Sequence, residues 1–516
     1  MSNLKSKRAV LDSDPFHSDD ASDPMLRALR NLAPQDALLF SVSGAVGGPA
    51  DQTGRFTYLF PELVSDPTSI LPTDESGEML PSITSGLEVL ATGMNAVSGN
   101  STIPAGFTYL GQFIDHDITF DPTSSLARLN DPNTVRNFRT PGLNLDSLYG
   151  GGPNLAPYLY DGNKLRIGGH ALGRDLPRAI KTSPAEGDRN DIAKAIIGDP
   201  RNDENLIVAQ VHCAFIAFHN KVVDLVVAEA STPAELIFTE SARRVRWHYQ
   251  WIIVNQFLPS FLRIDILDDV KANGNKFYTP GVNSVTMPVE FSMAAYRFGH
   301  SLIREDYNFN ANFRASTLEQ LFIFTGNKIP SVWEKAEWRE FFQFGTRVPA
   351  NFAQLVDAKI TNFMHSVPTP GGPVSVPRNN LKRGYAFSLP TGQAVAKKLG
   401  VAVLTEAEVS QVGGVELPSF TANPIFKQRT PLWYYILKES EVKEAGARLG
   451  AVGSRIVAEV FFGLLRADRT SYLNSPLGSA WVPTLPPVAA GTPAGDFRIT
   501  DLIVHAGHAL ADGSPT

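Results

Sequence analysis

The segment FTYLGQFIDHDITF, residues 107–120, combines the periodicity of a helix with polar groups that an apolar helix rarely carries. Its polar side chains recur at i, i+3, i+4 and i+7, which places four of them on one helical face: Gln112, Asp115, His116 and Thr119. Apolar residues cover most of the remaining surface. This face is either a solvated stripe on a surface helix or a row of buried groups that must find partners, because unpaired buried polar groups are costly.

The segment GDPRNDENLIVAQVHCAFIAFHNKVVDLVVAEA, residues 198–230, predicts a helix that is nearly all apolar beyond its first turn. Asp199 is suited to cap this helix and a proline follows at its first position, so the helix is expected over 200–228. Arg201 and Glu204 then share the first turn, where the helix dipole favours a glutamate. A plain cap with a surface arginine is the simpler interpretation when the segment is taken alone.

A third segment, AAYRFGHSLIRE at 294–305, belongs to a helix expected over 289–305. Arg297 and His300 share one face of this helix, and Gly299 lowers its stability by about 1 kcal/mol relative to alanine. A glycine beside a buried histidine indicates that something flat or bulky approaches the backbone. Taken alone, a satisfied core histidine is the better explanation of the segment.

The three segments together point to one chemistry. They supply a histidine with an arginine nearby, and a second histidine on a separate apolar helix. A haem peroxidase needs one imidazole as the axial ligand of iron. On the opposite face it needs a base for the peroxide proton and a cation for the charge that develops.

The chain resembles the animal haem peroxidase superfamily, the peroxidase–cyclooxygenase group that includes myeloperoxidase, and is most similar to its bacterial members. GQFIDHDITF is similar to the distal motif, which implies His116 as the distal histidine, Gln112 as the distal glutamine and Asp115 as one ester position to haem. RNDE is similar to the distal Arg-x-x-Glu element. It implies Arg201 as the distal arginine and Glu204 as the second ester position.

The proximal motifs of the family follow in the same order, and the resemblance runs from about residue 107 to 400. YRFGHSLI implies His300 as the iron ligand, with Arg297 beside the haem. RNNLKRGYAFSLP implies that Asn380 bonds the proximal imidazole and that Arg383 faces a haem propionate. The expected cofactor is therefore haem b, linked by esters through the two carboxylates named above where these form.

The family also binds calcium beside the distal histidine, and the resemblance implies such a site here. Asp117 matches its first ligand, and the loop RTPGLNLDSLYGG (139–151) offers alternating oxygens, as a hard cation requires: Thr140, the Gly142 carbonyl, Asn144 and Asp146. Asn144 stands where the family has a carboxylate, which lowers the charge of the site. A simple Asx turn is the alternative interpretation of the loop.

The resemblance implies a peroxidase that reduces hydrogen peroxide through an oxoferryl intermediate and oxidises small organic donors or halides. A fatty-acid dioxygenase on the same fold is an alternative, but the family's radical tyrosine position, three residues before the proximal histidine, is occupied by Arg297. Asn205 replaces the methionine that bonds a haem vinyl group in myeloperoxidase. A non-catalytic haem- or calcium-binding protein is a further alternative, opposed by the presence of His116, Arg201 and His300 together.

Composition fits this interpretation. The chain has 516 residues, a formal net charge of −6 and 43% hydrophobic residues, which is typical of a globular protein and gives no electrostatic reason to expect nucleic acid as a partner. The single cysteine, Cys213, excludes an intramolecular disulfide and a cysteine-based zinc site. No GxSxG or HExxH motif supports a hydrolase.

The expected fold is mainly α, a single large helical haem-peroxidase domain over residues 56–516 with long irregular loops and little β-structure. Residues 1–55 are polar and are expected to form an N-terminal arm. No secretory signal and no run of 18 apolar residues is visible, so no transmembrane segment is expected, and the protein is expected to be cytoplasmic or exported without a leader. Further helices are expected at 233–272, 388–400, 405–411 and 441–466.

Overall fold

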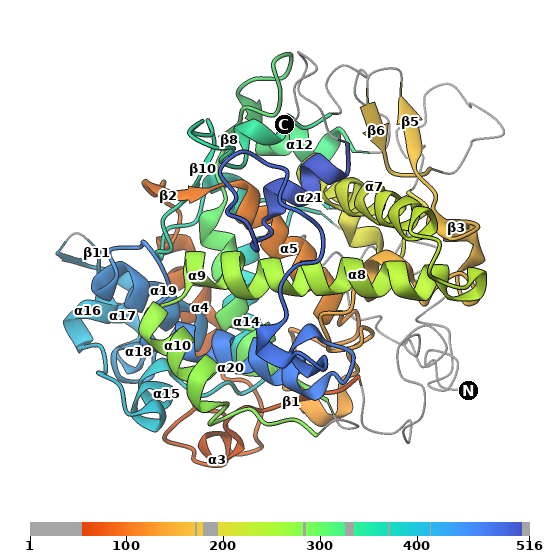
Figure 1. Ribbon diagram of the computed structural model, residues 1–516. Coiled ribbons are helices and arrows are strands. Elements are labelled where there is room, and N and C mark those ends of the chain that lie inside the picture. The colour runs from red at the N-terminus through yellow and green to blue at the C-terminus, as the bar shows by residue number, and fades with distance from the viewer. Residues whose placement is uncertain are drawn as a thin grey trace, which may run out of the picture.

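Long helices cross the centre of the molecule, and short helices and loops pack around them (Figure 1). This arrangement comes from a computed structural model that describes residues 54–170, 173–178, 195–281, 285–325, 335–369, 372–412 and 414–507. About 49% of it is helical and 10% is strand, so the expected mainly-α fold is confirmed. The expected N-terminal arm lies almost entirely outside the described residues.

The α-helices are α3 (Pro61–Val64), α4 (Pro81–Gly93), α5 (Gly106–Ile118), α6 (Asp146–Tyr149), α7 (Leu206–Ala228), α8 (Ile237–Ile252), α9 (Leu258–Phe261), α10 (Ile264–Asn273), α11 (Val289–Ser292), α12 (Leu318–Ile323), α14 (Val376–Ala386), α15 (Gly392–Leu399), α16 (Glu406–Ser410), α17 (Pro418–Ala422), α18 (Ile425–Gln428), α19 (Leu432–Lys443), α20 (Ala451–Ala467) and α21 (Ile499–His505). A π-helical turn, η5 (Ile253–Phe257), joins α8 to α9. Two 3-10 helices carry candidate site residues: η3 (Pro200–Asp203) and η6 (Ala295–Leu302).

The strands that the structure describes form short pairs rather than an extended sheet. They are β1 (Phe56–Thr57) parallel to β7 (Met287–Pro288), and the antiparallel pairs β2 (Asn100–Pro104) with β10 (Phe352–Gln354), β3 (Tyr160–Asp161) with β4 (Lys164–Leu165), β5 (Gly168–His170) with β6 (Gly173–Asp175), β8 (Asp306–Tyr307) with β9 (Ser316–Thr317), and β11 (Gln411–Val412) with β12 (Val415–Glu416). Each pair fixes where two distant segments meet, and the helices supply the core.

The helix expected over 200–228 is in fact two elements, η3 and α7. Asp199 caps η3, because its side chain accepts the N–H of Arg201. Asn205 then caps α7, where its side-chain oxygen accepts the N–H groups of Ile207 and Val208. Each of these two caps, six residues apart, begins a separate helix. The apolar periodicity alone did not reveal the break between them.

The helix expected over 289–305 is also wrong as a single element. A four-residue α11 is followed by Ala294, whose φ of −137° and ψ of −72° leave the helical region, and the chain continues as η6. With 3.0 residues per turn, side chains in η6 rotate by about 120° per residue rather than 100°. The proximal candidates therefore point in directions that α-helical spacing does not give.

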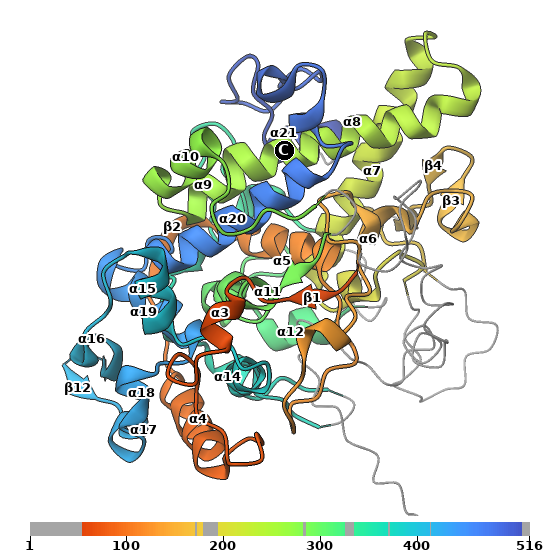
Figure 2. The same ribbon diagram turned by 90° about the horizontal axis from the view of Figure 1, so that it is seen from below.

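Helix α5 lies in the middle of the molecule in both views (Figures 1 and 2). All but two of its 13 residues are buried. It packs against α7, where the ring of Phe113 stacks on that of Phe215 with centroids 4.6 Å apart. The choice between a solvated stripe and buried groups is therefore settled: Asp115 and His116 are buried.

Helix α7 is long and apolar enough to cross a membrane. From the sequence no transmembrane segment was expected. In the structure 89% of its apolar window is buried inside the protein. A central helix of a globular core meets the same criteria as a membrane span, so this feature reflects the position of α7 beside α5.

Gly392, the first residue of α15, allows a close approach between α15 and α19. An added Cβ at this position would lie 1.9 Å from Cγ of Tyr435. We expect Gly392→Ala to lower the free energy of unfolding by about 1–3 kcal/mol through overpacking, measured by denaturant titration. Gly93→Ala is the control, because its Cβ would meet Leu417 at an ordinary 3.7 Å; equal stability losses in both variants would contradict the prediction.

Candidate active site

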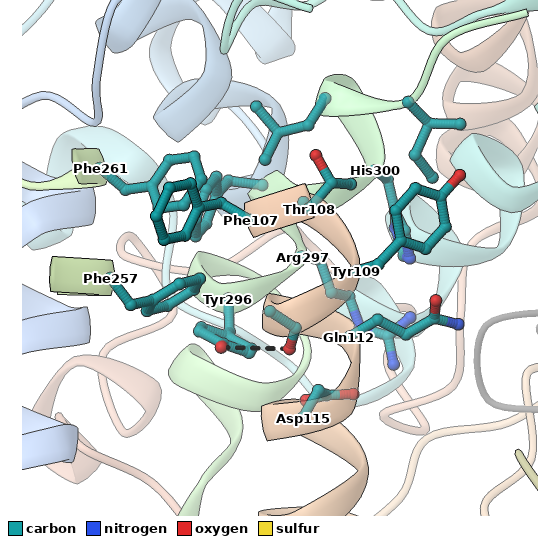
Figure 3. Close-up of a pocket in the computed structure, with 15 residues that line it drawn as sticks. Phe107, Thr108, Tyr109, Gln112, Asp115, Phe257, Phe261, Tyr296, Arg297 and His300 are labelled. Carbon is teal, nitrogen blue, oxygen red and sulfur yellow. Dashed lines mark hydrogen bonds between the residues drawn. The ribbon is translucent and has the colours of Figure 1, made fainter. Parts of the chain in front are cut away.

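A cavity of about 50 Å³ lies between α5 and η6. Its polar lining includes Gln112 and Asp115 from α5 and Arg297 and His300 from η6. The rest of the lining is largely aromatic and aliphatic: Phe107, Tyr109, Phe257, Phe261, Tyr296, Phe298, Leu302 and Ile303. In Figure 3 the labelled phenylalanines, Phe107, Phe257 and Phe261, lie on one side of α5, and Gln112 lies on the other.

His300 is held through a chain of hydrogen bonds behind its ring. Nη1 of Arg297 donates to Oδ1 of Asn380 at 2.6 Å, and Nδ2 of Asn380 lies 2.7 Å from Nδ1 of His300. Asn380 comes from α14, and Trp433 of α19 donates its indole N–H to the Arg297 carbonyl at 3.0 Å. Two further helices therefore fix the imidazole on the cavity wall.

This orientation of the Asn380 amide has a chemical consequence. An arginine can only donate, so the amide oxygen faces Arg297 and the amide nitrogen faces His300. A neutral imidazole that binds iron through Nε2 carries its proton on Nδ1 and needs an acceptor there. Iron binding by His300 therefore requires either a turned amide or an imidazole that has lost both protons.

The polar face of α5 meets η3 and the start of α7. Gln112 donates from Nε2 to Oε1 of Glu204 at 2.5 Å and accepts at Oε1 from Nδ2 of Asn205 at 3.2 Å. Asp115 accepts the hydroxyl proton of Thr119 at 3.0 Å and borders the cavity. Of the two carboxylates expected to form esters, Asp115 lines the cavity. Glu204 does not line it but is hydrogen-bonded to Gln112, which does.

His116 and Arg201 are both fully buried, and neither is among the described residues that line the cavity. Nδ1 of His116 is 2.8 Å from Oδ1 of Asn202. Arg201 donates from Nη2 to the carbonyl oxygens of His116, at 3.1 Å, and Thr119, at 2.7 Å, and its guanidinium stands 4.5 Å over the ring of Phe120. The arginine therefore sits behind the C-terminal end of α5, where the backbone carbonyls favour a cation.

A buried carboxylate, Asp199, binds this arginine and a second one. It accepts from Nε and Nη2 of Arg201 at 3.0 and 2.8 Å, and from Nε and Nη2 of Arg139 at 2.9 and 2.5 Å. Burial alone would raise the pKa of Asp199, but the two guanidinium groups hold it well below its usual range. Asp199 is therefore ionised at neutral pH.

Arg139 also reaches the loop expected to bind calcium. Its Nη1 is 3.5 Å from Oδ1 of Asp146, an oxygen that is buried and accepts no hydrogen bond. Asp117 approaches the same loop and accepts the N–H groups of Leu145 and Ser147 at 3.0 and 3.3 Å. Burial, reinforced by the charge of Asp146, raises the pKa of Asp117 to about 7.

The remaining loop oxygens surround these two carboxylates. Thr140 donates its N–H to Asp146 at 3.2 Å, Gly142 donates its N–H to the Thr140 carbonyl at 2.7 Å, and Asn144 accepts the N–H of Asp146 at 3.0 Å. The structure describes no cluster of three or more His, Cys, Asp or Glu side chains in its resolved ranges that could hold a metal. Two buried, mutually repelling carboxylates with neutral oxygens nevertheless suit a hard cation.

Arg383 follows Asn380 by one turn of α14 and is buried. Its Nη1 donates to Oγ of Ser124 at 2.6 Å and lies 3.5 Å from Oδ2 of Asp121. The arginine expected to face a propionate is therefore paired with the segment that follows α5.

Comparison with known proteins identifies the family of the chain. The family model described as animal haem peroxidase matches residues 127–476. The chain belongs to the animal haem peroxidase family. Its relatives include the chorion peroxidase of Aedes aegypti, which is 26% identical over 294 residues, 54% of this chain and 35% of that protein. The chain spans no more than 35% of the length of the curated relatives it matches.

Two of the solved structures that share the fold show its range. Peroxidase A from Dictyostelium discoideum has a TM-score of 0.60 at 16% identity, covering 84% of this chain and 91% of its own. A fatty acid alpha-dioxygenase from Oryza sativa, solved with palmitic acid, has a TM-score of 0.59 at 14% identity, covering 92% and 85%. One neighbour is a peroxidase and the other a dioxygenase, so the fold alone does not identify the reaction.

Several residues of the site were not found by sequence reasoning. Asp199 was interpreted only as a helix cap. Tyr249 received no role, although its hydroxyl donates to Asp117 at 3.3 Å. Asn202 lies inside the RNDE motif but received no role. Its position between an arginine and a glutamate that were both expected at the site was the one available signal.

Asp199 is expected to be essential for folding of the distal region. Asp199→Asn leaves two buried guanidinium groups without their carboxylate, which we expect to lower the free energy of unfolding by about 3–5 kcal/mol, measured by denaturant titration. Asp224→Asn is the matched control, since its ion pair with Lys164 is exposed and worth about 0–1 kcal/mol. A loss below 1 kcal/mol for Asp199→Asn would contradict the structural role of the shared carboxylate.

Proposed function

We propose that this chain is a haem-dependent peroxidase that reduces hydrogen peroxide and oxidises small organic donors or halides. The observation that carries the proposal is the cavity between α5 and η6, which has His300 on one wall and Gln112 and Asp115 on the other. Its lining is largely apolar, which is the chemistry that the face of a haem ring contacts, and Thr108 of this lining has a buried hydroxyl without a hydrogen-bond partner. Haem bound there would supply the iron that activates peroxide.

Each candidate residue has a proposed role. His300 would hold the iron, and Asn380 would orient its ring with the amide turned so that Oδ1 accepts the Nδ1 proton. His116 would take a proton from peroxide and return it. Arg201 would place a fixed cation directly behind His116, which favours the negative charge that builds as the O–O bond breaks.

Two carboxylates and one arginine are proposed to anchor the cofactor at its edge. Asp115 lies on the cavity wall, which supports its role as an ester position. Glu204 is held towards the same helix face by Gln112. Arg383 would turn one guanidinium N–H towards a propionate, and its Nε has no hydrogen-bond partner.

A calcium ion is proposed for the loop beside Asp117. Asp117 and Asp146 would supply the charge, and Thr140, Gly142 and Asn144 would supply neutral oxygens. The buried Oδ1 of Asp146, which accepts no hydrogen bond, supports this assignment. Arg139 neutralises part of the charge already, so we expect a modest affinity.

A fatty-acid dioxygenase is the second candidate function, and one observation favours it. Tyr296 lies in the aromatic part of the cavity, where Phe107, Phe257 and Phe261 would suit an acyl chain. The hydroxyl of Tyr296 donates to the Gly111 carbonyl at 3.2 Å (Figure 3). Arg297 still occupies the position at which the family carries its radical tyrosine.

The peroxidase proposal is tested by absorption spectra of the full chain expressed with added haem. The wild type is expected to show a Soret band that shifts with hydrogen peroxide. His300→Ala should lose the bound haem, and His116→Ala should keep it but react about 10²–10⁴-fold more slowly, since it lacks the base. His365→Gln is the matched histidine control, and a folded wild type that takes up no haem would contradict the proposal.

Tyr296→Phe separates the two candidate reactions in the same preparation. A peroxidase keeps its rate with peroxide and a small donor, because the phenol takes no part. A dioxygenase that uses this tyrosine loses oxygen uptake with a long-chain fatty acid, measured with an oxygen electrode. Fatty-acid-dependent oxygen uptake that the substitution abolishes would overturn the peroxidase assignment in favour of the alternative.

The calcium proposal is tested by thermal unfolding of the purified protein in a calcium chelator and with calcium restored. Calcium at about 100 times its dissociation constant would stabilise the folded state by about 2.7 kcal/mol, so the midpoint should rise on addition. Asp117→Asn should abolish this rise, whereas Asp131→Asn, in a separate cap at η1 (Pro132–Thr134), should keep it. An identical calcium response in both variants would place the ion elsewhere.

A further inference from the structure

Three of the six tryptophans of the chain gather where the C-terminal segment 470–498 crosses α8 (Figure 1). The ring centroid of Trp481 lies 5.4 Å from that of Trp247 and 5.8 Å from that of Trp251. Tyr472 lies 5.4 Å from Trp481 and 6.0 Å from Trp251. Trp481 is buried, whereas Trp247 and Trp251 are half-buried. These four residues form a tryptophan cluster at the surface of α8, and indole and phenol side chains are the ones that lose one electron most readily.

The two half-buried tryptophans of the cluster have different electrostatic surroundings. Trp251 donates its indole N–H to Oδ1 of Asp496 at 3.0 Å. Trp247 donates to the Thr470 carbonyl at 2.8 Å, and the guanidinium of Arg243 stands 4.2 Å over its ring. Loss of an electron leaves a positive charge on an indole, which a nearby carboxylate stabilises and a nearby guanidinium opposes. An electron is therefore removed more easily from Trp251 than from Trp247.

Asp496 carries its negative charge at neutral pH. Burial raises the pKa of this carboxyl group, but the hydrogen bonds that it accepts, that from Trp251 first, hold the pKa below its ordinary value. Nε of Arg498 donates to Oδ2 of Asp496 at 3.0 Å and holds the carboxylate in place. The two side chains are 40% and 28% exposed, so solvent screens the charge of the guanidinium. Oδ1 stays directed at the indole.

A continuous helical path joins Trp251 to the cavity. Helix α8 runs without a break into η5, whose last residue, Phe257, lines the cavity. Phe257 follows Trp251 by six residues, which is about 9 Å along the axis at 1.5 Å per residue. Electrons tunnel through covalent and hydrogen-bonded paths over distances of this order, so the two redox groups need not touch. A cofactor in the cavity is therefore within electronic reach of Trp251.

We propose that the tryptophan cluster is a second donor site, at which Trp251 passes electrons from bulky aromatic donors at the surface to the oxidised cofactor. This inference rests on the proposed peroxidase function, in which hydrogen peroxide is the oxidant. A donor that stacks against the half-buried rings needs no access to the interior of the protein. The carboxylate of Asp496 makes Trp251 the ring that reacts.

The electrons and protons of this step balance. Trp251 gives one electron to the oxidised cofactor, and its N–H proton moves towards Oδ1 of Asp496. A phenolic donor at the surface then returns one electron to Trp251, and the indole regains its proton. The donor is oxidised by one electron and releases its own proton to water. Two such cycles use the two oxidising equivalents of one molecule of peroxide.

A purely structural cluster that packs the C-terminal segment on α8 would behave differently. Either substitution, Trp251→Phe or Trp247→Phe, would then cost stability and leave the redox behaviour unchanged. The two variants form a matched pair, because both residues are half-buried members of the same cluster that donate one hydrogen bond. Asp496→Asn is a third variant, which keeps the indole and an acceptor oxygen but removes the charge.

The first test is electron paramagnetic resonance of the haem-loaded full chain, frozen after mixing with hydrogen peroxide in the absence of a donor. The wild type is expected to show a tryptophan radical that Trp251→Phe loses and Trp247→Phe keeps. Asp496→Asn should lower the yield of this radical. A radical that persists in Trp251→Phe, or that disappears only in Trp247→Phe, would overturn the proposal.

The second test measures steady-state oxidation of the bulky sulfonated dye ABTS and of the small donor hydroquinone. Trp251→Phe and Asp496→Asn should each lower kcat/KM for ABTS about tenfold, because the radical is lost or destabilised. The rate with peroxide and hydroquinone should stay at the wild-type value in both. An equal loss with ABTS in Trp247→Phe and Trp251→Phe would assign the effect to packing and contradict the proposal.

The order of oxidation within the cluster is tested without the cofactor. The haem-free full chain is oxidised by a laser flash with ruthenium tris-bipyridine and a cobalt(III) acceptor, and the tryptophan radical is followed by its transient absorption. Trp251→Phe should lose more of this signal than Trp247→Phe, and the reverse order would contradict the proposal. If the chain takes up no haem, the proposed function and the donor site fail together. If it reacts with peroxide but oxidises ABTS independently of Trp251, only the donor site fails.

Discussion

The distal region depends on one buried carboxylate that neutralises two arginines. Asp199 binds Arg139 from the loop at 139–151 and Arg201 from η3, and Arg201 in turn caps the end of α5. A carboxylate or a guanidinium buried alone would be strongly destabilising, but each one here has partners on every side. The three segments can therefore be buried only together.

The positions of the neighbouring side chains follow from this constraint. With Arg201 fixed behind α5, the residues that follow it face the same helix. Asn202 reaches His116, and Glu204 reaches Gln112. In a 3-10 helix side chains three residues apart eclipse, so Arg201 and Glu204, which follows the last residue of η3, face α5 from the same side. Asn202 is turned by about 120° from them and reaches His116.

The sequence revealed the elements whose signal is periodic. The apolar pattern of 107–120 predicted α5, which spans Gly106–Ile118, and the same pattern placed α7. It missed η3 and η6, because their ends depend on caps and on the backbone at Ala294 rather than on hydrophobic spacing. The expected site residues came from motif resemblance, which names residues but not the partners that surround them.

The partners were out of reach for a physical reason. Arg139 and Asp199 are 60 residues apart, and neither carries a pattern that pairs it with the other. The bridge from His116 through Asn202 to His212 joins positions 86 and 10 residues apart. Such contacts depend on how α5, η3 and α7 pack, and helix packing is decided by the whole core rather than by local sequence.

The shape of the aromatic part of the cavity does not distinguish the proposed peroxidase from a fatty-acid dioxygenase. The surroundings of Tyr296 favour the peroxidase proposal. Burial, with the charge of Asp115, raises the pKa of this phenol well above its usual value. A tyrosine that becomes a neutral radical must release its proton as well as an electron. Its hydroxyl donates a hydrogen bond to the Gly111 carbonyl. A peptide carbonyl is too weak a base to take that proton. An apolar cavity can hold a fatty acid, but the radical step also requires a proton acceptor at the phenol.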